Sequence, residues 1–231
     1  DLPRYKALLG NGTKLGINIS YEIQNEPNGI AEAFLIGEDY IGDDSVILIL
    51  GDNIFYGNQF STTVSKSIKD NQGATIFAYQ VNDPQRFGVV EVDDDFYATS
   101  IEEKPDVPKS NYAVTGLYIY DNTVIDISKS INPSARGELE ITAVNNEYLK
   151  QGKLKVEILT RGFAWLDTGT HSSLLQASLF MEALENNQKM KVACVEEISL
   201  DKGWISDAEL EKIASSYNNE YGEYLRGLID K

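Results

Sequence analysis

The stretch Ser45-Val46-Ile47-Leu48-Ile49-Leu50-Gly51-Asp52-Asn53 decides the fold class of this chain. Residues 46–50 are continuously apolar, which is typical of a strand buried on both faces of a parallel sheet. The strand is expected to end at Gly51, so that Asp52 follows its carboxyl end. Open α/β sheets bind ligands at that edge, where an aspartate can hold Mg²⁺ beside substrate phosphates. An aspartate that only caps the next helix explains the tripeptide equally well.

Helical and strand patterns alternate on both sides of this stretch. Upstream, 19–24 alternates apolar and polar residues like a half-buried strand, and 30–41 has apolar residues at helical spacing. Downstream, a helix is expected at 64–68 and a second short apolar strand at 74–81. This order predicts an α/β fold with a doubly wound sheet, mixed but mostly parallel.

The middle of the chain departs from this alternation. Strands with few helices between them are expected at 88–92, 98–103 and 112–120. Asp93-Asp94-Asp95 lies between the first two of these strands. It is either a cation site or a solvated hairpin turn, and the turn is favoured.

Helical spacing returns in the last third of the chain. It is expected at 141–148 and at 174–184, with a strand at 154–159 between them. Ser206 and Glu209 have the spacing of a capping box, which predicts a small helical appendage over 206–230.

The composition excludes several classes of function. The 231 residues carry a formal net charge of −16, whereas a nucleic-acid binder needs a basic surface. One cysteine cannot form an internal disulfide, and one histidine excludes a multi-histidine zinc site. The longest apolar run, 46–50, is far shorter than the ~20 residues that span a bilayer. We expect a cytoplasmic protein without membrane or nucleic-acid partners, and a chain whose natural beginning is absent.

Two further stretches carry groups suited to phosphate and sugar chemistry. Asp167 lies in Trp165-Leu166-Asp167-Thr168-Gly169-Thr170, again after a short apolar stretch, and two such aspartates make a shared divalent metal a reasonable hypothesis. Ile101-Glu102-Glu103-Lys104-Pro105 places a carboxylate and an ammonium at a strand end. The lysine can pair with phosphate, and the glutamate can accept sugar hydroxyls. A surface salt bridge explains that pentapeptide without any function.

Taken together, the chain resembles the sugar-1-phosphate nucleotidylyltransferases from end to end. The stretches that carry the resemblance occur in the family's order: Gln24-Asn25-Glu26-Pro27-Asn28-Gly29-Ile30-Ala31, Leu50-Gly51-Asp52-Asn53-Ile54-Phe55-Tyr56-Gly57, Arg86-Phe87-Gly88-Val89-Val90, Glu102-Glu103-Lys104-Pro105, Val114-Thr115-Gly116-Leu117-Tyr118, Arg136-Gly137-Glu138-Leu139-Glu140-Ile141-Thr142 and Trp165-Leu166-Asp167-Thr168-Gly169-Thr170. No single stretch is decisive, but their order is specific.

The resemblance implies a reaction between dTTP and glucose 1-phosphate. The sugar phosphate attacks the α-phosphorus in line and pyrophosphate leaves, so positioning and charge neutralisation carry the reaction. It implies that the catalytic residues are Asp52, Lys104 and Asp167, and that both aspartates hold Mg²⁺. It also implies assembly as a homotetramer.

The resemblance assigns binding roles as well. Gln24 would hydrogen-bond the base, and Gly29 would let the base approach the backbone closely. Lys104 and Arg136 would bind the sugar phosphate. Glu103 and the backbone at Gly88 and Val114 would hold the sugar hydroxyls. Tyr118 and Trp165 would line the sugar pocket.

Two departures from the family pattern stand out. The family begins with a strand and a Gly-rich loop carrying arginine, which no part of this chain matches, and the absent portion would be roughly 50–60 residues. We therefore expect the 231-residue chain alone to be inactive. Ala143 replaces the aspartate usual in the family after Ile141-Thr142. The chain is expected to be a single nucleotidyltransferase domain over 1–231, with helices at 191–231 as an appendage.

Three alternatives remain open. The nucleotide can be UTP rather than dTTP, and the fold can serve a non-catalytic nucleotide-sugar sensor. A retaining glycosyltransferase also uses aspartates and a divalent cation on a similar sheet. An Asp-x-Asp motif at a strand end would favour it, but Asp93 and Asp95 lie in an expected turn.

Overall fold

A computed structural model describes residues 2–229 and divides the chain into two compact units. The larger unit comprises 24–177, and the other combines the first 23 residues with the chain from Ser178 onward. The expectation of one nucleotidyltransferase domain with an appendage at 191–231 remains a prediction. The second unit begins at 178, within helix α7, and it includes the start of the chain.

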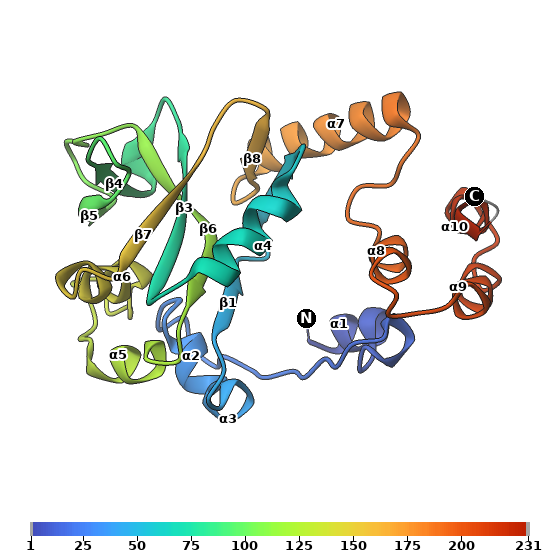
Figure 1. Ribbon diagram of the computed structural model, residues 1–231, viewed down its shortest axis with the longest axis horizontal. Helices are drawn as coiled ribbons and strands as arrows, with labels where there is room; N and C mark the ends of the chain where they lie inside the picture. The colour runs from blue at the N-terminus through green and yellow to red at the C-terminus, as the bar shows by residue number, and fades with distance from the viewer. Residues whose placement is uncertain (1, 230–231) are drawn as a thin grey trace. The chain divides into compact units, whose positions relative to one another are not determined.

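The larger unit is built on a six-stranded sheet (Figure 1). Its strands are β1 (Val46–Ile49), β3 (Ala74–Gln80), β4 (Gly88–Val92), β5 (Ala98–Glu103), β6 (Tyr112–Tyr120) and β7 (Leu154–Leu159). The order is β5-β4-β6-β3-β7, and β1 also pairs with β6. Each of these strands was expected from its apolar run, with ends within one or two residues.

The mixed α/β class is confirmed, but the expected majority of parallel pairings is not. Only β3 and β7 run parallel among the described strands, whereas β1–β6, β3–β6, β4–β5 and β4–β6 are antiparallel. For β4 and β5 the reason lies in their connection. A short turn joins them at Asp93, whose Oδ1 accepts from the backbone N–H groups of Asp95 and Tyr97. Strands joined in this way pair antiparallel. The hairpin turn expected at 93–95 is confirmed.

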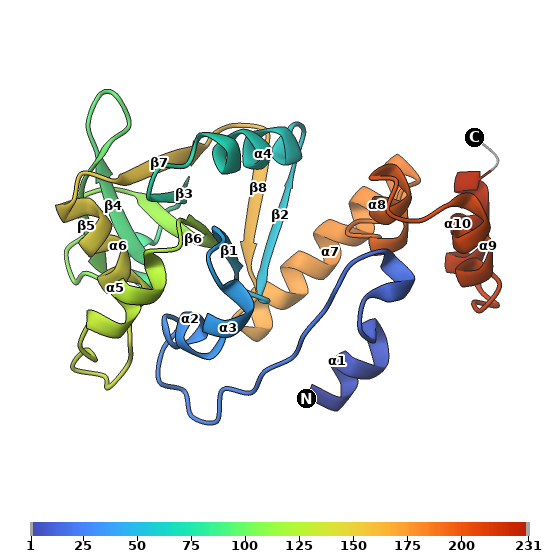
Figure 2. The same ribbon diagram turned by 60° about the horizontal axis from the view of Figure 1, so that its bottom comes forward.

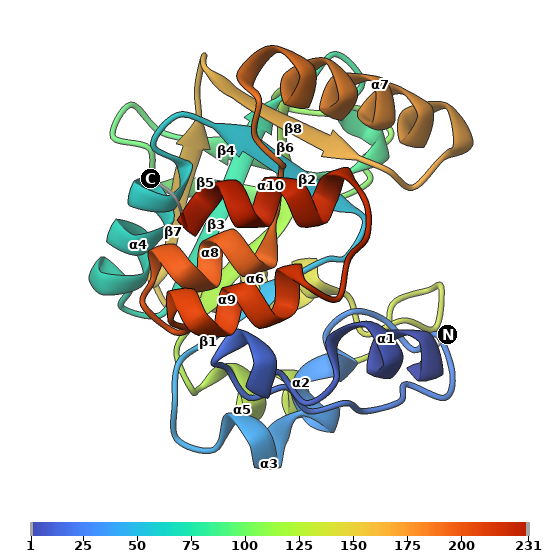
Figure 3. The ribbon, with the colours of Figure 1, turned by 90° about the vertical axis from the view of Figure 1, so that its right-hand side faces the viewer.

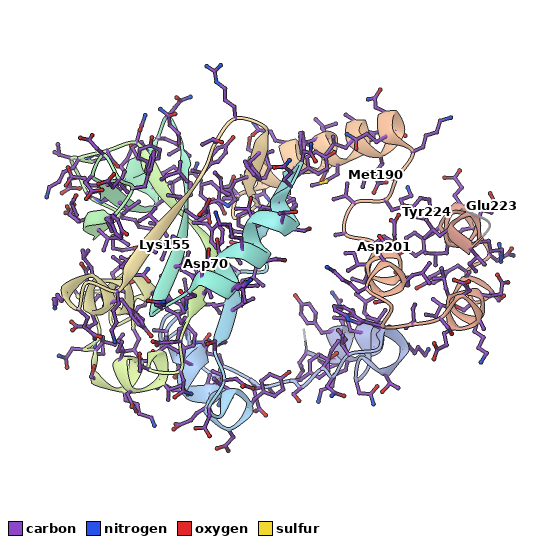
Figure 4. The ribbon with its side chains drawn as sticks, viewed as in Figure 1. Asp70, Lys155, Met190, Asp201, Glu223 and Tyr224 are labelled. Carbon is purple, nitrogen blue, oxygen red and sulfur yellow. The ribbon has the colours of Figure 1, made fainter. Side chains whose placement is uncertain are left out.

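Helices cover both faces of this sheet. On one face α2 (Glu32–Ile36), α5 (Val124–Ser130) and α6 (Ile141–Lys150) bury their apolar residues in the largest core cluster. On the other face α4 (Phe60–Asp70) contributes Phe60 and Val64 to a core around Phe77 and Leu117. A four-residue helix, α3 (Glu38–Ile41), leads into β1. Figure 4 labels Asp70, where α4 ends, and Lys155 in β7. The sheet is therefore enclosed between two helical layers.

Strand β1 is not buried on both faces as expected. Val46 and Leu48 pack against the core, while Ile47 and Ile49 are 45% and 58% exposed. Within residues 2–229, β1 pairs with β6 alone. A continuous apolar run indicates that both faces of a strand can be buried. Which face is in fact covered depends on the strands and helices that pack beside it. The strand expected at 19–24 does not form. This segment has no regular secondary structure.

Two strands outside the large sheet form an antiparallel ribbon. They are β2 (Asn53–Gly57) and β8 (Phe163–Asp167), seen side by side in Figure 2. Phe55 and Phe163 of the ribbon pack against the core on the α4 side of the sheet. The sequence did not predict this ribbon, because its two strands lie more than a hundred residues apart and are short.

The second unit is helical. Its elements are α1 (Leu2–Leu9), the 3₁₀ turn at Thr13–Leu15, the later part of α7 (His171–Gln188), α8 (Val195–Asp201), α9 (Asp207–Ala214) and α10 (Glu220–Ile229), of which the last three are prominent in Figure 3. Cys194, Leu210 and Leu225 are buried in its core. Ser206 caps α9 with the expected capping box. Tyr224 of α10, labelled in Figure 4, donates a hydrogen bond to Glu197 of α8.

The start of the chain belongs to this unit because of a close backbone approach. Gly16 has a φ of +71°, and a Cβ there would lie 2.3 Å from the carbonyl oxygen of Trp204. Only glycine allows two backbone segments to meet so closely in that conformation. Among the residues that the structure describes, no helix has the length and apolar character needed to cross a membrane.

Candidate active site

The ribbon brings the two predicted metal ligands, Asp52 and Asp167, together. Asn53 lies opposite Asp167 in the β2–β8 register, and the backbone N–H and hydroxyl of Thr168 both donate to the Asp52 carbonyl at 2.8 Å. A Cβ on Gly169 would lie 3.2 Å from Asp167 Oδ1 and 3.7 Å from Asp52 Oδ2. The two carboxylates therefore border the same glycine, as the metal hypothesis requires.

The charge of this carboxylate pair is only partly compensated. Arg86 places Nη2 3.6 Å from Asp167 Oδ2, but its Nη1 is closer to Asp83, at 3.0 Å. Within residues 2–229 there is no cluster of three or more metal-ligating side chains. Two oxygen ligands that leave most positions open suit Mg²⁺, which keeps several waters and takes substrate phosphates as further ligands. The residues therefore fit the metal that the sequence suggested.

Strand β6 connects this pair to the predicted sugar-phosphate residues. Val114 and Tyr118 pack in the same core cluster, and Gly116 lies between them where the β3–β6 register shifts. The backbone N–H of Gly116 donates to Asn53 Oδ1 at 2.9 Å. A Cβ on Gly88 would lie 3.8 Å from Val114 and 3.4 Å from Glu103 Oε2. The strand thus reaches from the ribbon to Glu103.

Tyr118 lies beneath both groups of charged residues. Its ring is only 4% exposed and stacks on Tyr120, with ring centroids 6.1 Å apart. Burial raises the pKa of the phenol above its usual value, and the charges of Glu103 and Asp52 raise it further. Asp52 and Glu103 therefore both lie within electrostatic reach of this hydroxyl, which stays neutral. Its predicted role in lining the sugar pocket remains a prediction.

The second part of the site is a cluster of ions around Glu103. Thr142 donates its hydroxyl to Glu103 Oε2 at 2.6 Å, and Arg136 Nη2 and Lys104 Nζ lie 3.6 and 3.7 Å from Glu103 Oε1. Arg136 donates through Nε and Nη2 to Glu140 at 2.8–3.1 Å. These hydrogen bonds raise the pKa of Arg136. The structure thus gathers Glu103, Lys104 and Arg136, which the sequence assigned to the sugar phosphate.

Lys104 has an unusual backbone. Its φ is +43°, in the left-handed region, and its N–H donates to the Phe87 carbonyl at 3.0 Å. A non-glycine residue in this region costs on the order of 1–3 kcal/mol and persists only where its surroundings hold it. Phe96, in the turn after Asp93, has the same kind of backbone, so the role predicted for Lys104 remains a prediction.

The predicted base-binding residues form a separate turn. Gln24 Nε2 donates to the Gly29 carbonyl at 3.0 Å and to Glu32 at 2.6 Å. Gly29 has a φ of +107°, and a Cβ there would lie 2.4 Å from the Leu139 carbonyl oxygen. Close packing on Leu139 is thus sufficient reason for this glycine. The predicted contact of Gln24 and Gly29 with a base remains a prediction.

Several site residues escaped assignment from the sequence. Asn53, Arg86, Glu140 and Thr142 all lie inside the stretches that carry the family resemblance, which was the one signal that pointed to them. Their partners are distant in the chain, for example Thr142 and Glu103 at a separation of 39 residues. Trp165, which was predicted, donates Nε1–H to Asn53 Oδ1 at 2.6 Å and packs on Phe87 at a centroid distance of 5.1 Å.

The chain is similar over its whole length to proteins of one named activity. A glucose-1-phosphate thymidylyltransferase from Neisseria meningitidis is 53% identical, over 100% of this chain and 81% of its own length. One from Mycolicibacterium smegmatis is also 53% identical, over 100% of this chain and 80% of its own.

A Bacillus anthracis structure assigned as a glucose-1-phosphate thymidylyltransferase, determined with a sucrose, matches with a TM-score of 0.70 and 41% identity. The match covers 78% of this chain and 71% of that one. A UDP-glucose pyrophosphorylase with UDP-glucose shares the fold at a TM-score of 0.64 and 22% identity, over 71% of this chain and 66% of its own. The nucleotidyl transferase family model matches residues 1–183. The chain therefore belongs to the nucleotidyl transferase family.

Proposed function

We propose that this chain transfers a thymidylyl group from dTTP to glucose 1-phosphate, giving dTDP-glucose and pyrophosphate. The observation that carries the proposal is that neighbouring residues of β6 lie beside both groups of charged residues. Gly116 contacts Asn53, which follows Asp52, and Val114 lies against Gly88, which borders Glu103. A reaction between a metal-bound triphosphate and a sugar phosphate needs these two groups beside one another.

The carboxylate pair would hold Mg²⁺, which neutralises the charge of the triphosphate and of the leaving pyrophosphate when it is bound. Asp52 is exposed and the Asp167 side chain is 22% exposed, so both are open to a ligand from solvent. Arg86 beside Asp167 reduces the repulsion between the carboxylates before a cation binds.

The ion cluster would bind the sugar phosphate. Arg136 and Lys104 present half-exposed cationic groups, and both now pair with carboxylates. A phosphate with two negative charges competes for them, and arginine binds it through two parallel hydrogen bonds. Glu103, which is held by Thr142, would accept a sugar hydroxyl, and Gly88 leaves space beside it because it has no side chain. Orientation of the sugar phosphate for in-line attack is the contribution of this cluster.

The direct test is a nucleotide panel. Because the 231-residue chain alone is expected to be inactive, activity is measured on the full-length protein here and for the variants below. Pyrophosphate release is measured with glucose 1-phosphate and each of dTTP, UTP, CTP and ATP, with Mg²⁺ present. We expect dTTP to give the highest kcat/KM. Equal rates with all four nucleotides contradict the thymidylyl assignment. Binding of dTDP-glucose without turnover of any nucleotide favours a sensor instead.

We also propose that the protein assembles as a homo-oligomer, a tetramer by its family resemblance, in the cytoplasm. Sedimentation velocity measures the first property directly. A monomer at micromolar concentration contradicts the expected assembly.

A further inference from the structure

Asn53 makes three hydrogen bonds with one carboxamide. It is the first residue of β2 and directly follows Asp52. Its Nδ2 donates to Asp52 Oδ1 at 2.8 Å. Its Oδ1 accepts from the backbone N–H of Gly116 at 2.9 Å and from Trp165 Nε1 at 2.6 Å. Both ends of the amide are therefore in use, toward three different elements of the site.

The chemistry of the partners fixes which way this amide points. A backbone N–H and an indole N–H are donors only, so the Gly116 and Trp165 groups require the oxygen of Asn53. The nitrogen must then face Asp52, where it can only donate. A flipped amide would set donors against donors on one side and an oxygen against a carboxylate on the other. The carboxylate of Asp52 is thus held by a group that cannot reverse.

Packing leaves the amide little room to move. A Cβ on Gly116 would lie 2.6–2.8 Å from the atoms of the Asn53 carboxamide, so the amide lies directly against the β6 backbone. Trp165 is 9% exposed and is fixed in turn by Phe87 and Tyr79, at centroid distances of 5.1 and 6.0 Å. The support of the Asp52 carboxylate therefore runs through the ring that is predicted to line the sugar pocket.

We propose that Asn53 is a positioning residue that holds the Asp52 carboxylate toward the same space as Asp167 and couples it to Trp165. The inference rests on the proposed function, because it concerns the same metal and sugar site. Hydrogen-bond partners behind a metal ligand fix its orientation, and their removal typically lowers metal affinity by about 10–100-fold. Through Asn53, a change at the Trp165 indole reaches a carboxylate that the indole does not touch.

Cation binding without substrates tests this coupling. The parent protein for these measurements carries Trp204→Phe. Since the sequence has two tryptophans, Trp165 is then the only one, and any change at an indole is a change at this residue. Mn²⁺ is titrated into this parent, Asn53→Ala, Trp165→Phe and the double variant, with water-proton relaxation as the readout. Asn71→Ala is the matched control, because Asn71 also donates to a backbone carbonyl and accepts a side-chain hydroxyl, at the end of α4. Circular dichroism and thermal melting establish that each variant is folded.

We expect Asn53→Ala to weaken Mn²⁺ binding about tenfold and Trp165→Phe to weaken it less, with Asn71→Ala unchanged. Trp165→Phe is expected to add nothing in the Asn53→Ala background, because the link is already broken. Unchanged Mn²⁺ affinity in Asn53→Ala overturns the inference. So does a double variant whose loss of affinity equals the sum of the two single losses. Neither result contradicts the proposed function. If Asn53→Ala does not fold, the Trp165→Phe variant decides, since its full Mn²⁺ affinity also overturns the coupling. A parent that binds no Mn²⁺ contradicts the metal part of the proposed function as well.

Discussion

The two ends of the candidate site balance their charges in different ways. At the ribbon, Asp52 and Asp167 face one glycine. Within residues 2–229 the cation paired with Asp167 is Arg86, which is bound more closely to Asp83. Around Glu103, by contrast, Arg136 and Lys104 already face carboxylates of the same cluster. The first end needs a cation from solution, whereas the second binds an anion only by exchanging partners.

Because of this difference, substitutions at the two ends should have different effects on turnover and on substrate affinity. Removal of a charge at the carboxylate pair removes a ligand that nothing else replaces. Removal of a charge in the ion cluster has a smaller effect on turnover, because the remaining charged side chains can still pair with one another. Effects on turnover should therefore concentrate at the ribbon, and effects on sugar-phosphate affinity should concentrate at the cluster.

The largest effect is expected for Asp167→Asn. The amide keeps the shape of the side chain but removes the negative charge that would hold the cation, so kcat/KM for dTTP should fall by at least about a hundredfold. Pyrophosphate release over a range of Mg²⁺ concentrations measures this loss. Asp43→Asn, in an exposed turn, is the control and should retain activity. If the kcat/KM of the Asp167→Asn variant for dTTP is within threefold of the wild-type value, the proposed difference between the two ends of the site is wrong.

A smaller effect is expected for Arg136→Lys. Lysine keeps the charge but cannot reproduce the two-pronged contact that the guanidinium makes with Glu140 and would make with phosphate. A charged hydrogen bond is worth about 1.5–3 kcal/mol, so the KM for glucose 1-phosphate should rise roughly tenfold or more. The KM for dTTP should stay nearly constant, and Arg161→Lys serves as control. Equal increases in both KM values would show that the two ends are not separable.

The smallest effect is expected for Thr142→Val. Valine fills the same space but leaves Glu103 without its 2.6 Å donor, while Arg136 and Lys104 continue to neutralise the carboxylate. The loss should be about 1–2 kcal/mol in the free energy of unfolding, measured by urea denaturation. The KM for glucose 1-phosphate should rise only a few-fold. Thr75→Val is the matched control, because Thr75 is also buried and donates its hydroxyl, to Asn71 Oδ1 at 2.8 Å. An equal rise in the KM for glucose 1-phosphate there would remove any special role for Thr142.

The elements that the sequence predicted correctly are those whose signal is local. The apolar runs of β3 and β6, the turn at Asp93 and the capping box at Ser206 each depend on residues within a few positions of one another. The site residues assigned from the family resemblance include Asp52 and Asp167, which the structure brings together, and Glu103, Lys104 and Arg136, which it also gathers.

By itself, the sequence determined the α/β class, most strand and helix positions, and the chemical types of the site residues. These follow from a side-chain period of two or 3.6 and from short-range hydrogen bonding, which a single stretch of chain contains. Only the tertiary structure decided the antiparallel pairings, the exposure of Ile47 and Ile49 on β1, and the union of the first 23 residues with the C-terminal helices. It also decided the amide contacts of Asn53 with Gly116 and Trp165, 63 and 112 residues away. The physical reason is that the choice of a distant partner depends on how the whole chain packs, and no local pattern specifies it.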